Sequence, residues 1–199
     1  MSILTDPKAN ILYSGGLVQS VLPPEREFGY TYFSSMIPPF KPKRMLMLGY
    51  GYGTTPKLAK KIWGDDFEIV GVDDKSFRES EGEYLEKGAF HYVKECTESF
   101  DYVAIDLFNG DQIPGFVFDE EFVQSLKRIA TDLISINVIN DEKQMLKLKI
   151  YEDNFRFEYW KAAYNNRILF YRNDDAIEDP KNEETKEAQE QTEKPEVLS

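Results

Sequence analysis

The sequence contains only one cysteine, Cys96, and one histidine, His91, in 199 residues. A single cysteine cannot form an intrachain disulfide, which agrees with a reducing compartment and leads us to expect a cytoplasmic protein. Zinc sites built from several His and Cys ligands are excluded, and a Cys–His catalytic pair is not expected. We therefore expect no metal site.

Long apolar runs and a basic, apolar amino terminus are also lacking. No stretch of 18 apolar residues could span a membrane, and residues 1–10 do not resemble a signal peptide. The hydrophobic and aromatic shares of 41% and 14% suffice for a sizeable core. The length of 199 residues fits one domain with a tail.

Positive charge is in deficit, since 24 Lys and Arg against 36 Asp and Glu give a net charge of −12. Residues 173–199 hold ten acids and three lysines and hence −7 of this charge. This tail has too few large apolar residues to fold, so we predict that it is disordered; an acidic interaction arm is the alternative. No basic face for nucleic acid is indicated, and the acidic body favours a cationic small substrate.

The most informative stretch is a four-residue apolar run followed by glycines on alternate positions, Gly49, Gly51 and Gly53. The run, Met45–Leu48, predicts a buried strand. A helix is expected to begin at Pro56 with Thr55 as its cap and to end at Gly64. The glycines let a ligand approach the backbone beside the positive end of the helix. The alternative is a tight turn without a ligand.

A second apolar run, Glu68–Val72, ends in Asp73 and Asp74. An acid about 20 residues after a glycine loop is where nucleotide-binding α/β folds hold ribose hydroxyls. A carboxylate suits this task because it can accept two hydrogen bonds from a diol. The G-x-G-x-G spacing favours a nucleoside ligand such as S-adenosylmethionine. We expect Asp73 to bind the ribose, with Asp74 as the rival.

The segments around this unit predict further strands and helices. Residues 11–22 predict a β-hairpin, and residues 25–36 an aromatic helix whose rings either pack in the core or line a pocket. A capping box at Ser76 predicts a helix to about residue 86. A third strand is expected over residues 90–94, and it leaves no room for a helix before the next strand, residues 101–106.

The second half continues the alternation. Asp119 is expected to cap a helix, and a strand over residues 133–139, a charged helix over 142–151 and a hairpin over 155–171 follow. We therefore predict an α/β, Rossmann-like, seven-stranded methyltransferase-type sheet, mostly parallel, with a C-terminal antiparallel hairpin. Three parts are expected: a small N-terminal β element with the aromatic helix (1–40), the adenosyl-ligand-binding domain (41–172) and the acidic tail (173–199).

The order of these motifs resembles the polyamine aminopropyltransferases, the spermidine synthase family. The resemblance spans about residues 11–140, and Gln19 is its most particular residue. The segments that carry it are Leu17–Ser20, Glu25–Tyr30, Pro42–Gly49, Phe100–Asp106 and Glu121-Phe122.

The resemblance implies a role for each matching residue. Gln19 would contact the amino-acid end of S-adenosylmethionine or its decarboxylated form, which is the expected substrate. Gly49, Gly51 and Gly53 would let the backbone approach it, and Asp73 would bind its ribose. Asp106 would stand near the transferred group and orient the amine of a polyamine, the implied second substrate.

The sequence also departs from the family pattern. The family's D-S-[ST]-D loop reads Asp106-Leu107-Phe108-Asn109, and an amide cannot accept a proton at neutral pH. Asp111, two positions on, is the expected substitute. The family's adenine-binding Gly-Asp step after the third strand reads Glu95-Cys96 here. Glu95 would fill that role one position early, and the helix after it would be missing.

Three classes of function remain open on this sequence. The first is a transferase, with aminopropyl transfer to a polyamine ahead of methyl transfer. The second is a non-catalytic binding or scaffold relative, which the missing helix and the lost carboxylate favour. The third is a sensor of an adenosyl ligand. The oligomeric state is open as well, a homodimer included.

Overall fold

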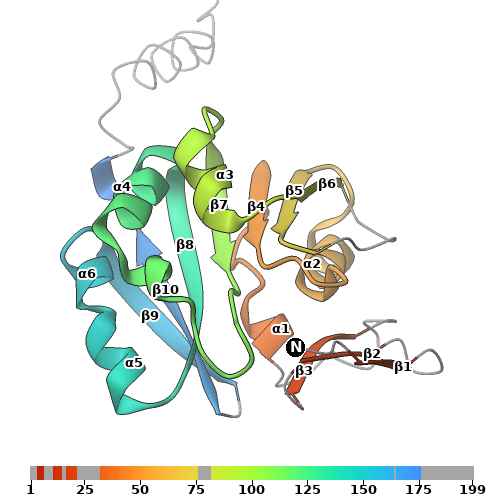
Figure 1. Cartoon of the computed structure of the whole chain (residues 1–199). Helices are drawn as coiled ribbons and strands as arrows, with labels where there is room; N and C mark the ends of the chain where they lie inside the picture. Colours follow the sequence, from red (N-terminus) through yellow and green to blue (C-terminus); the bar gives the residue numbers. More distant parts are fainter. Residues whose placement is uncertain are drawn as a thin grey trace, which may run out of the picture.

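The computed structural model describes residues 4–6, 11–14, 17–21, 32–75, 82–163 and 165–175, and for residues 4–21 it describes the backbone path alone. Figure 1 shows a large sheet with helices on both faces and a small three-stranded sheet beside it. The candidate functional residues belong mainly to the large sheet.

The glycine loop lies in the predicted strand–turn–helix unit. Strand β4 covers Arg44–Leu48, helix α2 covers Thr54–Trp63 and the parallel strand β5 covers Glu68–Asp73. The predicted cap is wrong, because the carbonyl of Gly53 already accepts from the amide of Lys57 (2.9 Å) and Gly53 is the N-cap residue. Thr55 lies inside the first turn, and its hydroxyl donates to the carbonyl of Phe33 (3.3 Å). The helix ends at Gly64 as expected.

The predictions for the described residues 82–95 are wrong. Glu83–Glu86 form strand β6, where the end of a helix was expected, and residues 76–81 lie outside the described residues. Ala89–Glu95 form helix α3 instead of the third strand. This segment is helical because Ala89, Tyr92 and Val93 are buried together at i, i+3 and i+4 spacing. The crossover to the next strand therefore does contain a helix, as parallel connections usually do.

The following elements largely confirm the prediction. Strand β7 covers Phe100–Ile105, and a short 3-10 helix over Gly115–Phe118 leads to helix α4, Glu120–Ile129. Two acids in the first turn of α4 suit the positive end of its dipole. Asp119 is the N-cap residue as expected, although its side chain makes no capping hydrogen bond.

Strand β8 covers Ala130–Ile139, and two short helices follow, α5 (Glu142–Lys147) and α6 (Lys149–Glu152), where one was predicted. The buried Leu148 separates them, and its turn lets the buried Tyr151 on α6 pack in the core.

The chain returns as the predicted antiparallel hairpin, β9 (Arg156–Ala163) and β10 (Asn166–Arg172). The strand order of the large sheet is β6-β5-β4-β7-β8-β10-β9. The five neighbouring strands β6, β5, β4, β7 and β8 are parallel, and β10 is antiparallel to both of its neighbours, β8 and β9. The fold class is therefore the predicted seven-stranded, mostly parallel, Rossmann-like sheet.

Each face of the sheet has its own hydrophobic core. Helices α3, α4 and α6 cover one face, and α2 covers the other together with the short helix α1, Tyr32–Ser35. Phe33 of α1 is buried, so at least one of the expected aromatic residues is part of the core. The beginning of the predicted aromatic helix, residues 25–31, lies outside the described residues.

The small sheet contains β1 (Leu4–Asp6), β2 (Ile11–Ser14) and β3 (Leu17–Val21). Strands β2 and β3 confirm the predicted hairpin, whereas β1 was not predicted. In Figure 1 this sheet lies next to α1, on the side of the molecule to which the parallel strands point.

The first three residues of the predicted acidic tail, residues 173–175, are part of the folded body. Asn173 is buried, and its side-chain amide donates to the carbonyls of Lys127 and Ala130 (both 2.7 Å). Asp174 pairs with Arg156. Residues 176–199, the rest of the predicted tail, lie outside the described residues.

Candidate functional site

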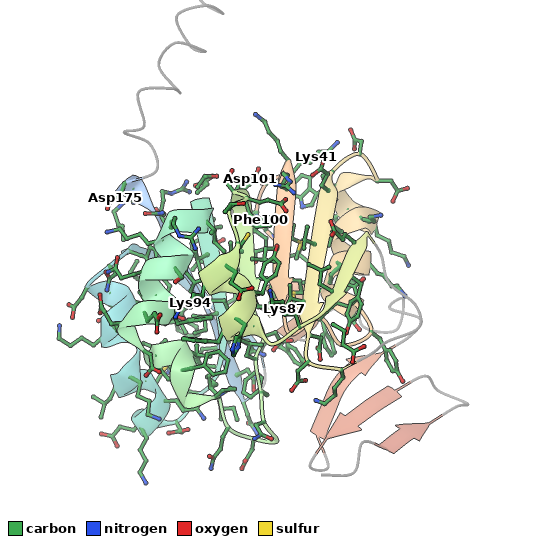
Figure 2. The ribbon with its side chains drawn as sticks, turned by 45° about the horizontal axis from the view of Figure 1, so that its top comes forward. Lys41, Lys87, Lys94, Phe100, Asp101 and Asp175 are labelled. Atoms are coloured by element: carbon green, nitrogen blue, oxygen red, sulfur yellow. The ribbon has the colours of Figure 1, made fainter. Side chains whose placement is uncertain are left out.

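The site is expected where the strand order of the large sheet reverses. From β4 the chain adds β5 and β6 on one side, and from β7 onwards it adds strands on the other. Open α/β sheets bind ligands at such a switch point, outside the carboxyl ends of the strands. Lys41 and Asp101 mark the amino ends of β4 and β7 in Figure 2, and the site lies at the opposite edge.

Gly49 and Asp106 meet at this switch point, directly after β4 and β7. The amide of Asp106 donates to the carbonyl of Leu48 (2.8 Å), and the amide of Gly49 donates to that of Val72 (2.9 Å). A Cβ on Gly49 would lie 2.1 Å from the carbonyl oxygen of Asp106. Two residues that the sequence marked out separately are thus in backbone contact.

Asp73 closes the glycine loop from the end of β5. Its Oδ2 accepts from the amide of Gly51 (2.9 Å), and its Oδ1 accepts from the amide of Lys75 (3.2 Å). The structure therefore brings the predicted loop and the predicted acid together. Asp74, its rival, is exposed and lies beside the amine of Lys75 (3.5 Å).

The environment of Asp73 fits an adenosyl ligand. Burial raises the pKa of this carboxyl, the hydrogen bond from Gly51 and the charge of Lys75 lower it, and Asp74 raises it. Each carboxylate oxygen has two lone pairs and uses one for a backbone amide, so capacity remains for both hydroxyls of a ribose. Gly51 and Asp73 could hold such a group jointly.

Asp106 heads a chain of side-chain amides. The Nδ2 of Asn137 on β8 donates to Asp106 Oδ1 (2.8 Å), and the Nδ2 of Asn166 on β10 donates to Asn137 Oδ1 (2.8 Å). Asn137 is only 2% exposed although it is polar. Three strands thus converge on one carboxylate.

Burial raises the pKa of Asp106 to about 7, the hydrogen bond from Asn137 opposes this rise, and the charge of Asp73 adds to it. A carboxyl group that titrates near neutral pH can both accept and return a proton, which is the property of a general base. The coupling to Asp73 also indicates that the two acids share one site.

Asp111 belongs to the turn that follows Asp106. Asn109 and Gln112 pair through their backbones, with the amide of Asn109 donating to the carbonyl of Gln112 (2.7 Å). Asp111 sits exposed at the tip of the resulting turn, next to Gly110. The charge that raises the pKa of Asp106 is Asp73 and not this loop carboxylate.

The structure does not place Glu95 at the site. Along the chain, the third strand of the large sheet is β6, after β4 and β5. The residues that follow it are Lys87 and Gly88. Glu95 is the last residue of α3, exposed and paired with Lys87, which is labelled in Figure 2. The charge and hydrogen bond of Lys87 lower the pKa of this carboxyl. The expectation failed because it rested on taking α3 for a strand.

Gln19 lies in β3 of the small sheet, and its side chain is outside the described part of the chain. In Figure 1 this sheet is on the carboxyl-end side of the large sheet. The role implied for Gln19 therefore stays a prediction.

Sequence reasoning missed four residues around the site. Asn137 lies within β8 and Asn166 begins β10, and no local sequence signal marks either residue, because their contact depends on the register of the two strands. Tyr50 fills the space between Gly53 and Gly71 beneath the loop, with the ring of Tyr84 5.4 Å away. These two rings support the loop from below.

No group of three or more His, Cys, Asp or Glu side chains among the described residues is arranged to hold a metal ion. No helix within the described ranges is long and apolar enough to cross a membrane.

No protein-family model matches the chain. A curated relative, the polyamine aminopropyltransferase of Vibrio vulnificus (strain CMCP6), is 22% identical over 150 residues, which cover 65% of this chain and 50% of the relative. The chain thus spans about half the length of the curated relative it matches.

Several solved structures share the fold. A spermidine synthase in complex with the transition-state analogue AdoDATO has a TM-score of 0.60 at 16% identity, covering 86% of this chain and 68% of that one. Aeropyrum pernix fibrillarin with S-adenosyl-L-methionine has a TM-score of 0.55 at 12% identity, covering 86% and 98%. TrmN from Thermus thermophilus has a TM-score of 0.56 at 12% identity, covering 75% and 51%. The chain therefore has the S-adenosylmethionine-dependent methyltransferase fold and is similar to the spermidine synthase-like proteins within it.

Proposed function

We propose that the chain is a transferase of an adenosyl sulfonium, which moves an aminopropyl group from decarboxylated S-adenosylmethionine to an amine of a polyamine. The observation that carries this proposal is Asp106, an oriented carboxylate with a pKa of about 7, placed at the switch point beside Gly49 and electrostatically coupled to Asp73. The similarity to a polyamine aminopropyltransferase supports the choice of reaction.

Binding of the adenosyl part falls to the glycine loop and Asp73. Gly49, Gly51 and Gly53 leave the backbone accessible, and Asp73 accepts the ribose hydroxyls. Gln19 would contact the aminopropyl end. The two acids Asp73 and Asp106 repel the carboxylate that S-adenosylmethionine carries and its decarboxylated form lacks, which supports the decarboxylated substrate.

The reaction requires a neutral amine next to the sulfonium. Asp106 attracts the cationic amine, accepts its proton and holds the nitrogen in line with the carbon that is bonded to sulfur. The carbon–nitrogen bond forms as the carbon–sulfur bond breaks, and methylthioadenosine leaves with the electron pair of that bond. The proton lost by the amine resides on Asp106 and then passes to water.

One carboxylate suffices in this proposal. The sequence placed the second one at Asp111, but burial and Asp73 already raise the pKa of Asp106 to about 7. Asn109, which stands where the family has the second acid, belongs to the turn and not to the proton transfer. The presence of α3 also removes the missing helix as an argument for a non-catalytic relative.

The test is release of methylthioadenosine from decarboxylated S-adenosylmethionine with putrescine, cadaverine or spermidine. We expect Asp106→Asn to lower the release by about 100-fold or more, the low end of general acid–base contributions. The matched control Asp153→Asn changes an exposed carboxylate that pairs with Lys149 on α6, and it should leave the rate unchanged. The rate of the parent should rise with pH around 7, where Asp106 ionises.

Four results would redirect the proposal. No methylthioadenosine with any amine, or full activity of Asp106→Asn, would contradict aminopropyl transfer. Release of S-adenosylhomocysteine from S-adenosylmethionine would indicate methyl transfer instead. A loss of rate in Asp111→Asn would show that a second carboxylate, Asp111, takes part in the reaction.

A further inference from the structure

Two buried or half-buried amides connect the C-terminal hairpin to Asp106. Asn137 belongs to β8 and Asn166 is the first residue of β10, and both hydrogen bonds in the chain measure 2.8 Å. In the sheet register Asn137 pairs with Ile168, and Asn166 pairs with Ile139, so the amides are diagonal neighbours on adjacent strands. Both amides of this hydrogen-bonded chain therefore belong to strands of the large sheet.

These hydrogen bonds have a direction. An ionised carboxylate only accepts, so the NH2 end of Asn137 must face Asp106, and its carbonyl end must face Asn166. If the amide of Asn137 turned over, its oxygen would face the carboxylate and its NH2 would face the NH2 of Asn166. While Asn166 keeps its orientation, both contacts would then be repulsive, and the polar groups would be left unpaired in a buried place.

We propose that Asn137 and Asn166 are positioning residues that favour the ionised form of Asp106 and hold its carboxylate in a single orientation at the switch point. Asn137 acts on Asp106 directly, and Asn166 acts by fixing which end of Asn137 faces it. The task of Asp106 as acceptor of an amine proton rests on the function proposed above, whereas the amide chain stands independently of it.

The charged groups near Asp106 do not stabilise its carboxylate. Asp73 on β5 is the charge that acts on Asp106 among the described residues, and it disfavours ionisation. On the hairpin, Arg167 lies over the ring of Trp160 (4.8 Å), and Lys161 donates to the carbonyl of Ile37 (3.5 Å). Both cations are therefore engaged elsewhere, and the donated hydrogen bond of Asn137 stabilises the carboxylate.

The experiment is a pH titration of the Asp106 carboxyl by 13C NMR in the full chain without ligand, with the signal assigned by its loss in Asp106→Asn. We expect Asn137→Leu, which removes the donor and keeps the volume, to raise the pKa of Asp106 by about 1–2 units, the scale of a hydrogen bond to a charged group. Asn166→Ala should raise it by less, because Asn137 can then still donate for part of the time.

A second pair of variants tests the direction of the chain. Asn166→Asp presents an acceptor to Asn137, turns its amide over and should raise the pKa of Asp106 strongly. Asn165→Asp, its matched control, adds the same charge at the exposed neighbouring residue and lies outside the amide chain. The shift in Asn166→Asp should clearly exceed that in Asn165→Asp.

The proposal is wrong if Asn166→Asp shifts the titration no more than Asn165→Asp, or if a folded Asn137→Leu leaves it in place. A merely structural role would lower the melting temperature without moving the titration. Asn166 is half-buried at a strand end, so its variants should fold and decide the question even if Asn137→Leu does not. Because no substrate is present, failure of the proposed transfer reaction would not alter this result.

Discussion

Gly49 and Asp106 fit together only because residue 49 has no side chain. The carbonyl oxygen of Asp106 would lie 2.1 Å from a Cβ at that position, closer than any nonbonded contact allows. Gly49 also has a φ of 84°, in the left-handed region that costs other residues free energy. The backbone geometry of the site therefore depends on glycine twice, once for conformation and once for space.

Gly49→Ala should accordingly lower the free energy of unfolding by more than its conformation alone explains. We expect about 1–2 kcal/mol from the positive φ and about 1–3 kcal/mol more from overpacking against Asp106. Chemical denaturation measures the sum. Gly110→Ala is the matched control, since its φ is 70° and nothing lies within 4 Å of the added Cβ. Equal losses in the two variants would contradict the close contact.

The raised pKa of Asp106 predicts a pH dependence of stability. Its pKa is about 7 in the folded protein and about 3.9 in an unfolded chain, so between these values the folded state binds more protons. The stabilising contribution is fully present below about pH 4 and is lost as the pH rises through about 7.

The parent should therefore lose stability relative to Asp106→Asn as the pH rises from about 4 to about 7. Urea denaturation of both proteins across this range gives the difference directly, and other titrating groups cancel in it. A difference that stays constant with pH would show that Asp106 is not held at a raised pKa.

The sequence was sufficient for the elements whose apolar pattern is unambiguous. Met45–Leu48, the glycine loop and Asp73 were predicted from local residues, because a buried parallel strand and its turn are encoded next to each other. The hairpin after residue 155 was predicted for the same reason. These elements place Gly49, Gly51, Asp73 and Asp106 at one edge.

Residues 83–95 were predicted wrongly because two patterns compete there. Phe90, Tyr92 and Val93 have high strand propensity. At helical spacing, however, four residues can be buried together against the sheet, namely Ala89, Tyr92, Val93 and Cys96. This packing makes the segment a helix. Tyr84 and Leu85 form a strand only because β5 offers an edge to pair with. The error carried over to Glu95, whose expected role depended on the order of the elements.

The amide chain could not be predicted because it depends on sheet register. Asn137 and Asn166 are far apart in sequence, and their contact follows from the antiparallel pairing of β8 with β10. A shift of one residue would turn either side chain to the other face of the sheet. Local composition holds no information on this.

The end of the folded body gives a further prediction. The amide of Asn173 donates to the carbonyl of Asp132 (2.8 Å), and its side chain donates to two more carbonyls. A chain that ends at Arg172 should be less stable by about 1–3 kcal/mol than one that ends at Asn173. Extension to Asp175 should add little, because the ion pairs of Asp174 and Asp175 are at the surface.

Thermal and urea denaturation of the three truncated chains gives the comparison. If the chains ending at Arg172 and Asn173 are equally stable, the contacts of Asn173 do not contribute, and the body ends where the composition changes.

The central claim is that the carboxyl edge of β4, β5 and β7 binds an adenosyl ligand through the glycine loop and Asp73. Isothermal titration calorimetry with S-adenosylmethionine, its decarboxylated form and methylthioadenosine tests it most directly. We predict binding of decarboxylated S-adenosylmethionine and methylthioadenosine. Asp73→Asn should weaken it by about 1.5–3 kcal/mol, and the exposed neighbour Asp74→Asn should bind as the parent does. No binding of any of the three ligands, or full binding by Asp73→Asn, would contradict the claim.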